Sequence, residues 1–218
     1  MRTYFVELAG TQPLLMHQDN IRWSEKVKKW QKTPENKKLS VAGDDRSPAW
    51  GWLGALYYDN ESVTMPSDNI MSVLREGGAL VPTGKGQKTF KAQTQSGILT
   101  KEVSWPVLVG GEPVPVEALQ VLEGEMDFEV HQEVVADLGF ELFVKRARIG
   151  QAKHIRVRPR FDNWKLEGHL LVLDEQITTE ILQSILTQAG LYKGLCDWRP
   201  SSRTPGPFGT FTAVIKEV

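Results

Sequence analysis

Three arginines alternate with apolar residues in the stretch HIRVRPRF, residues 154–161. If this stretch is a β-strand, Arg156, Arg158 and Arg160 share one face at intervals of about 6.5 to 7 Å. Each guanidinium keeps its charge and offers a planar fork of donors that suits phosphate oxygens. Because Pro159 cannot donate to a ladder, the strand lies at a sheet edge or is bulged. The pattern predicts a phosphate-binding strand; the alternative is an edge strand whose charge prevents aggregation.

Charge is sorted along the chain although the net charge is only −1. Residues 145–160 hold seven Lys or Arg, among them Lys145, Arg146 and Arg148, and no acid, whereas residues 112–141 hold nine acids and no cation. The lack of a nearby acid favours an anionic partner for the arginines. An acidic face meeting a basic one would also suit head-to-tail assembly, and simple solubility is the competing explanation.

Two glycine-bearing segments add cations to this set. In KGQKTFKAQTQSG, residues 85–97, Lys85, Lys88 and Lys91 surround Phe90. Such an arrangement can follow a sugar-phosphate chain while the ring stacks on a base; a solvated loop with one anchoring Phe is the alternative.

The second segment lies near the C-terminal end and is rich in glycine, proline and serine. It carries Arg199 and Arg203, and Gly206 and Gly209 would leave backbone amides open to a phosphate. A plain connector is the competing interpretation.

Residues for catalysis or for a metal or cofactor are not indicated. The four histidines are scattered, and the lone Cys196 has no neighbouring base. GKGQKT, residues 84–89, lacks the spacing of a phosphate-binding P-loop. His17, with Asp19 nearby, is a candidate for acid–base chemistry on RNA, and an ordinary polar loop is the alternative.

The periodicity predicts an α+β fold. We expect strands at residues 3–8, 98–108, 140–149, 154–161, 164–173 and 208–215, with helices at 67–77 and 178–189, and a short basic helix at 21–32. Residues 49–66 suggest a hairpin that turns at Asp59 and Asn60, and residues 82–97 a mobile loop. Without its insertions the order is βαββαβ, a ferredoxin-like (RRM-like) core whose two helices cover one sheet face. The prediction is one elaborated domain over 1–218, with insertions at about 10–65 and 79–140.

Composition indicates a cytoplasmic protein. One cysteine excludes an internal disulfide, no apolar run is long enough for a membrane span, and 40% hydrophobic residues are ordinary for a globular protein.

Three motifs resemble the RAMP superfamily, the ferredoxin-like RNA-binding proteins of CRISPR effector backbones. They are AGTQPLLMHQ (9–18), VTMPSDNIMSVLREG (63–77) and PSSRTPGPFGTFTAV (200–214). The chain also resembles phage and prophage proteins with a C-terminal motif like Trp198-Arg199-Pro200. The RAMP resemblance implies RNA held across the sheet and by the loop that carries Arg199, Arg203, Gly206 and Gly209, with the lysine loop as a projecting thumb.

The leading hypothesis is therefore a non-enzymatic RNA-binding subunit that oligomerises along a guide or another single strand, with single-stranded DNA as a further ligand. A phage structural or assembly protein and a RAMP-type RNA-processing nuclease are the alternatives. The central premise is that arginines without internal counterions converge on the sheet face that the helices leave open.

Overall fold

The computed structural model describes residues 1–149 and 152–218 and is a mixed α/β structure with antiparallel sheets. In chain order the elements are β1 (Arg2–Gly10), β2 (Leu14–Leu15), α1 (Ile21–Lys32), the 3₁₀ helix η1 (Ala49–Ala55), β3 (Thr64–Pro66), α2 (Ser67–Gly78), α3 (Lys91–Gly97), β4 (Ile98–Thr100), β5 (Ser104–Val109), β6 (Glu112–Pro113), α4 (Glu117–Gln120), α5 (Phe128–Asp137), β7 (Glu141–Ile149), β8 (Ala152–Phe161), β9 (Trp164–Val172), α6 (Thr179–Tyr192) and β10 (Phe211–Glu217). In the described part of the chain, no helix is long and apolar enough to cross a membrane.

The chain separates into two compact units, each built from segments that are distant in the sequence. Unit 1 comprises Met1–Leu15, Thr64–Pro113 and Asp162–Val218, and unit 2 comprises Met16–Val63 and Val114–Phe161. The two segments of unit 2 fall largely within the insertions expected at 10–65 and 79–140, and they also include the arginine strand β8.

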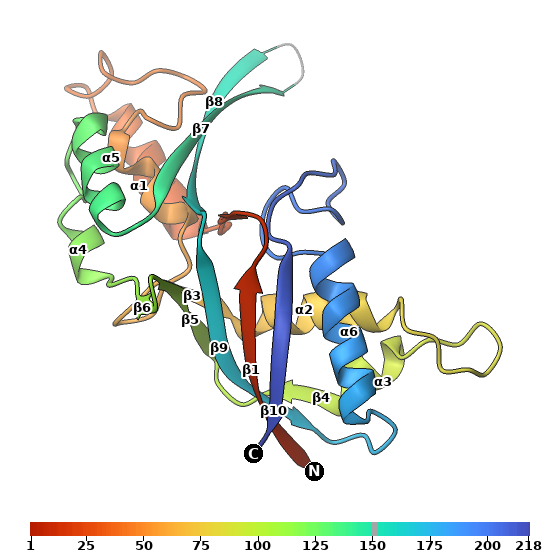
Figure 1. The fold of residues 1–218 in the computed structure, drawn as a ribbon. Coiled ribbons are helices and arrows are strands. Elements are labelled where there is room, and N and C mark those ends of the chain that lie inside the picture. Colours follow the sequence, from red (N-terminus) through yellow and green to blue (C-terminus); the bar gives the residue numbers. More distant parts are fainter. Residues whose placement is uncertain (150–151) are drawn as a thin grey trace. The chain divides into compact units, whose positions relative to one another are not determined.

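Unit 1 is organised around a sheet in which β10, β1, β9, β5 and β3 lie side by side (Figure 1). Strand β1 pairs antiparallel with β9 on one side and with β10 on the other. The stretch expected as one strand over 98–108 is two strands, β4 and β5, which both pair with β9. The break occurs where Glu102 accepts a hydrogen bond from the backbone N–H of His169 at 2.9 Å. A side-chain carboxylate thus replaces a backbone acceptor at this point of the ladder.

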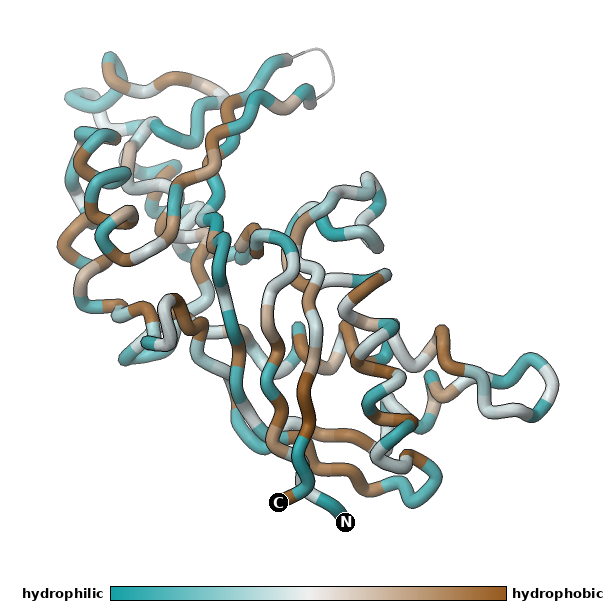
Figure 2. Tube along the Cα trace, in the orientation of Figure 1, coloured by the Kyte–Doolittle hydropathy of each residue, from teal (hydrophilic) through white to brown (hydrophobic). Residues whose placement is uncertain are grey.

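The core of unit 1 lies between this sheet and helices α2 and α6. Alternate residues of β1 point into it: Tyr4 and Val6 are fully buried and Leu8 is 1% exposed. The two helices approach closely because Gly77 has no side chain; a side chain there would overlap the carbonyl of Ile185. Figure 2 shows apolar residues recurring along β1, β9 and α6, whereas the loop between α2 and α3 is largely polar. Both helices predicted from periodicity are present.

The helix starts follow local chemistry that the sequence reveals only in part. Thr178 caps α6, because its hydroxyl accepts from the N–H of Ile181 at 3.4 Å. Ser67 is the first residue of α2, and the cap position belongs to Pro66, which makes no side-chain hydrogen bond.

Unit 2 packs helices against the hairpin of β7 and β8, which are paired in antiparallel register along their whole length. Its interior is aromatic: the rings of Phe140 and Phe161 stack at 4.6 Å, and the buried Trp52 donates to His131 Nδ1 at 3.2 Å. The helix predicted at residues 21–32 is α1.

The hairpin expected over residues 49–66 is wrong in its first arm. Residues 49–55 form η1, a tight helix whose Trp50 and Trp52 are buried. The 3₁₀ helix packs closely against Trp23, because a side chain on Gly54 would overlap the Trp23 ring. This tertiary packing decides the conformation of residues 49–55 against their β-propensity. The turn itself is present, since Asp59 accepts from the N–H groups of Glu61 and Ser62.

Candidate nucleic-acid interface

The arginines of β8 lie in unit 2 and share a face, as their alternation predicts. The register places Arg156 opposite Lys145, Arg158 opposite Phe143 and Arg160 opposite Glu141. Directly opposed residues of an antiparallel pair lie on the same face, so Lys145 belongs to the arginine face. Arg146 and Arg148, which alternate with it, lie on the other face, so the basic stretch divides between two surfaces.

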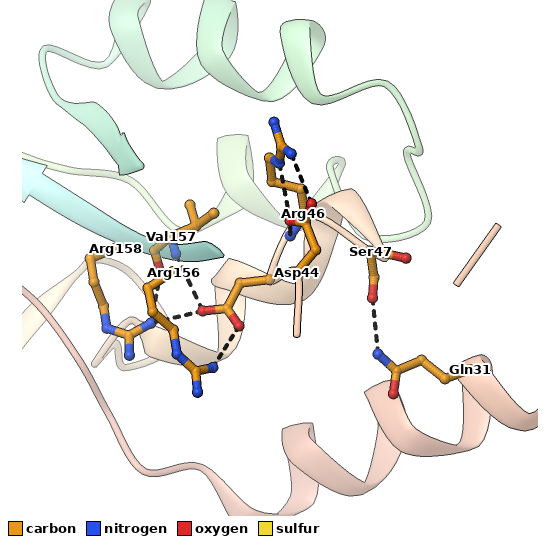
Figure 3. Close-up of polar contacts among 8 residues, drawn as sticks. Gln31, Asp44, Arg46, Ser47, Arg156, Val157 and Arg158 are labelled. Atoms are coloured by element: carbon orange, nitrogen blue, oxygen red, sulfur yellow. Dashed lines mark hydrogen bonds and ion pairs between the residues drawn. The ribbon is translucent and has the colours of Figure 1, made fainter. Parts of the chain in front are cut away.

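The premise that these arginines have no internal counterions is wrong. Arg156 donates from Nη1 to Asp45 Oδ1 at 2.8 Å, and Arg158 donates from Nη1 to Asp45 Oδ2 at 3.2 Å. Figure 3 labels the two arginines, and their dashed lines end on this carboxylate, which carries no label there. Arg160 donates to Glu141 Oε1 at 2.7 Å. The sequence does not indicate Asp45 as their counterion, because Asp45 is more than a hundred residues away from Arg156 and Arg158 along the chain. A parallel bridge between residues 44 and 155 brings it to the strand.

The open sheet face of unit 1, where the arginines were expected, carries a different set of side chains. Phe5 and His169 pair across β1 and β9 there, with ring centroids 5.6 Å apart. The charges on this face have mixed sign, and Lys165 donates to Glu7 at 3.2 Å. The predicted convergence of arginines on this face is therefore wrong.

The lysine loop lies in unit 1 and is only partly a loop. Lys85 and Lys88 are exposed, whereas Lys91 begins helix α3, which replaces the expected loop over residues 91–97. Phe90 is only 7% exposed, so its predicted role in base stacking is wrong. The lysines border a hollow of about 640 Å³, whose other polar lining includes four glutamines, Gln87, Gln93, Gln95 and Gln176.

The C-terminal loop also belongs to unit 1, and it holds Arg199 firmly. The guanidinium of Arg199 donates to Glu76 at 2.9 Å, to the hydroxyl of Ser201 at 2.9 Å and to the carbonyl of Cys196 at 3.3 Å. Arg203 is exposed. The loop thus fixes one arginine and leaves the other at the surface.

Gly206 and Gly209 do not present open amides, contrary to the prediction. The N–H of Gly209 donates to the carbonyl of Pro13 at 2.7 Å, and that of Gly206 donates to the carbonyl of Arg199 at 3.3 Å. A side chain at Gly209 would overlap the carbonyl of Leu195, and one at Gly206 would overlap Trp198. These glycines are required for close packing inside the loop.

The backbone of this loop is strained at two residues that are not glycine. Cys196 has φ 63° and Trp198 has φ 49°. Residues that carry a side chain rarely adopt this left-handed region of backbone conformation. Such strain persists where the surrounding structure enforces it, which is frequently the case at functional sites. Burial raises the pKa of the Cys196 thiol to about 12, so this cysteine is a neutral packed group.

A second hollow of about 280 Å³ joins these parts of unit 1. It is lined by Arg75 and Glu76 of α2, by Lys91 and Gln95 of α3, and by Lys193 after α6. Lys91 and Gln95 also line the larger hollow, so the two hollows adjoin. We call the cations bordering them the basic face of unit 1: Arg75, Lys85, Lys88, Lys91 and Lys193.

The charge of this basic face is not cancelled internally. Among the described residues, none of its five cations lies within ion-pair distance of a carboxylate. The acid in the smaller hollow, Glu76, is engaged by Arg199. Arg199 therefore acts as a local counterion that keeps the surface positive.

Sequence reasoning missed Arg75 and Lys193, because each is a lone cation on an otherwise ordinary helix or helix end. Their significance depends on the packing of α2 against α6, which no local pattern reveals. In the parts of the chain described here, no group of three or more His, Cys, Asp or Glu side chains is placed to hold a metal ion.

Comparison with known proteins adds no family. No protein-family model matches the chain, and no curated protein matches it significantly.

Proposed function

We propose that this protein binds single-stranded RNA through the basic face of unit 1, as a non-enzymatic subunit of RAMP type. The observation that carries the proposal is the adjacency of the two hollows, which share Lys91 and bring the lysine loop beside α2 and α6. Sequence-distant cations thereby form one continuous surface.

The chemistry of this surface suits a sugar-phosphate backbone. Lysine ammonium groups bind phosphate as mobile point charges, and a strand that they neutralise releases condensed counterions. Glutamine side chains in the larger hollow offer both donors and acceptors, which suit base edges and the 2′-hydroxyl group. Contacts of this kind favour binding that tolerates many sequences and weakens with salt.

The topology of unit 1 supports the RAMP-type part of the proposal. Strands β10, β1, β9 and β5 are neighbours in that order, α2 precedes β5 in the chain, and α6 connects β9 to β10. A βαββαβ chain whose two helices cover one face of the sheet produces this arrangement. In this proposal unit 1 is the ferredoxin-like core, and unit 2 is an elaboration of it.

The test is the affinity of a fluorescent RNA strand for the variant Lys88→Ala/Lys91→Ala/Lys193→Ala. Each lysine that contacts a phosphate adds about 0.7 to the slope of log affinity against log salt for a single strand. We expect the triple variant to bind more weakly at every sequence tested and to lower that slope by about 2. Fluorescence anisotropy over a salt series measures both quantities.

The matched control is Lys101→Ala/Lys216→Ala, which removes exposed lysines of unit 1 that line neither hollow. It should bind RNA like the wild type. Equal salt slopes for the wild type and the triple variant would contradict the proposal. Cleavage of the labelled RNA during incubation would contradict its non-enzymatic part, and single-stranded DNA of the same sequence measures the contribution of the 2′-hydroxyl.

A further inference from the structure

Unit 2 contains a cavity of about 420 Å³ that the RNA-binding proposal does not use. Its wall is formed by one side of α1, by η1, by the segment around Asp44 and Asp45, and by the start of β8. Sites for small molecules and cofactors commonly have volumes of about 300 to 1,000 Å³. The cavity therefore has room for a molecule the size of a mononucleotide.

Three nitrogen-bearing side chains with unused hydrogen-bond donors line this cavity. Lys28 comes from α1, and His154 and Arg156 come from β8. Within the described residues, Lys28 and His154 make no side-chain hydrogen bond, and Arg156 uses only Nη1, on Asp45. These donors reach the cavity from two different elements and can therefore approach a tetrahedral anion from different sides.

The carboxylates of the cavity are mostly neutralised. Asp45 is taken up by Arg156 and Arg158. Asp44 accepts two hydrogen bonds from the side chain of Arg46, and these bonds hold the pKa of Asp44 below its ordinary value. Asp19 is exposed. The unengaged donors thus favour an anion over a cation.

Two of the donors, Arg156 and His154, are also held in place before any ligand arrives. Asp45 accepts from both guanidiniums and, at 3.2 Å, from the N–H of Val157 between them (Figure 3). Gly43 has φ 77°, and a side chain there would come within 2.6 Å of His154 Nδ1. Only a glycine lets the chain pass this close to the imidazole. Fixed donors bind an anion with less loss of side-chain freedom.

We propose that this cavity binds a phosphomonoester carried by a nucleotide, with Lys28, His154 and Arg156 as ligands of the phosphate. The group comes either from a free mononucleotide or from the terminal phosphate of a strand. Asp45 is a positioning residue, because it acts through the two arginines. The inference uses residues of unit 2 alone and does not depend on the basic face of unit 1.

The first experiment compares AMP, adenosine and inorganic phosphate as ligands of the full chain by isothermal titration calorimetry. Hydrogen bonds to a charged group contribute enough that their loss weakens binding about tenfold or more. We expect AMP to bind at least about tenfold more tightly than adenosine. Measurable binding of AMP and adenosine with equal affinity would overturn the proposal, as would the absence of binding by every phosphate-bearing probe in this and the strand experiment.

The second experiment uses neighbouring lysines of α1 as a matched pair. Lys28 lines the cavity and Lys29 does not, and both are exposed, so neither substitution should disturb the fold. Lys28→Ala and His154→Ala should each weaken AMP binding about tenfold, whereas Lys29→Ala should leave it unchanged. If Lys28→Ala and His154→Ala both bind AMP like Lys29→Ala, the assignment is wrong.

A third experiment identifies the source of the phosphate. Short strands with a 5′-phosphate, a 3′-phosphate or neither are compared with AMP in the wild type and in His154→Ala. Tighter binding of one phosphorylated strand that His154→Ala abolishes indicates a strand terminus, whereas His154-dependent binding of AMP alone indicates a free nucleotide. The basic-face variant Lys88→Ala/Lys91→Ala/Lys193→Ala should bind AMP normally, which separates failure of this inference from failure of the RNA-binding proposal.

Discussion

The side chain of Glu102 contacts both the backbone and the imidazole ring of His169 on strand β9. It accepts from the backbone N–H of His169 and lies 2.7 Å from His169 Nδ1. Partial burial pushes the pKa of Glu102 upward, but the hydrogen bonds from His169 outweigh it and hold this pKa below the ordinary 4.5.

The lowered pKa of Glu102 predicts a stability that depends on pH. A carboxylate whose pKa is depressed on folding stabilises the folded state above its unfolded value, and the stabilisation is lost as pH falls through the folded value. The difference in thermal midpoint between wild type and Glu102→Gln should therefore shrink on acidification from about pH 7 to about pH 3. Circular dichroism melts measure it.

Glu167 provides the control for this prediction. It lies on the same face of β9 as His169 and engages no ion pair in the part of the chain that the structure describes. The thermal midpoint of Glu167→Gln should differ only slightly from that of the wild type across the same pH range. If the difference in thermal midpoint between wild type and Glu102→Gln stays constant from neutral to acid pH, the charge of the Glu102 carboxylate does not contribute to stability.

At the scale of elements, β10 depends on one buried residue at its start. Phe211 is 1% exposed and its ring lies 6.4 Å from that of Trp164, whereas Val214 of the same strand is 64% exposed. Phe211→Ala should lower the free energy of unfolding by about 3 to 5 kcal/mol, because it leaves a cavity in the core. Val214→Ala should change it by less than about 0.5 kcal/mol. Urea titration checks both, and equal effects would contradict the packing described.

The elements that the sequence predicts well are those with a strong local period. α2, α6, β1, β8 and β9 all follow from apolar spacing. Helices η1, α3, α4 and α5 were missed. Of these, η1 and α3 are short and are stabilised by partners outside the segment: η1 packs around Trp23, and α3 contacts α2. Local propensity carries little information about such segments, because tertiary packing decides their conformation.

The sequence predicts the types of residue in the candidate site, but it predicts their location in the fold only in part. The alternation of Arg156, Arg158 and Arg160 correctly predicts a shared face. Their counterion Asp45 and the hollow that joins Lys91 to Lys193 depend on contacts between residues about a hundred apart. A sequence pattern describes spacing along one element, and it does not state which carboxylate another segment brings to that element.

For the whole molecule, the RNA-binding proposal includes assembly of several copies along a strand. Phosphate contacts are independent of sequence, so each additional length of strand offers another site. The acidic stretch 112–141 lies in unit 2 apart from its first two residues, whereas the basic face belongs to unit 1. In the proposed assembly the two surfaces meet in a head-to-tail contact between copies.

This assembly predicts that stoichiometry grows with strand length. Native mass spectrometry of the protein with RNA strands of increasing length should show complexes with one, two and more copies. The series should collapse in high salt, where the phosphate contacts weaken. A single copy on every strand, however long, would contradict assembly while leaving binding itself intact.

The position of β1 between β9 and β10 has a consequence for synthesis on the ribosome. Strand β1 is translated before both of its neighbours, which are encoded at residues 164–172 and 211–217. Until both neighbours emerge, Tyr4, Val6 and Leu8 lack the strands that bury them, and the nascent chain exposes these apolar side chains. Slow decoding of the codons for residues 173–217 would lengthen this interval, so the yield of folded protein should respond to codon choice there more than to codon choice for residues 2–10.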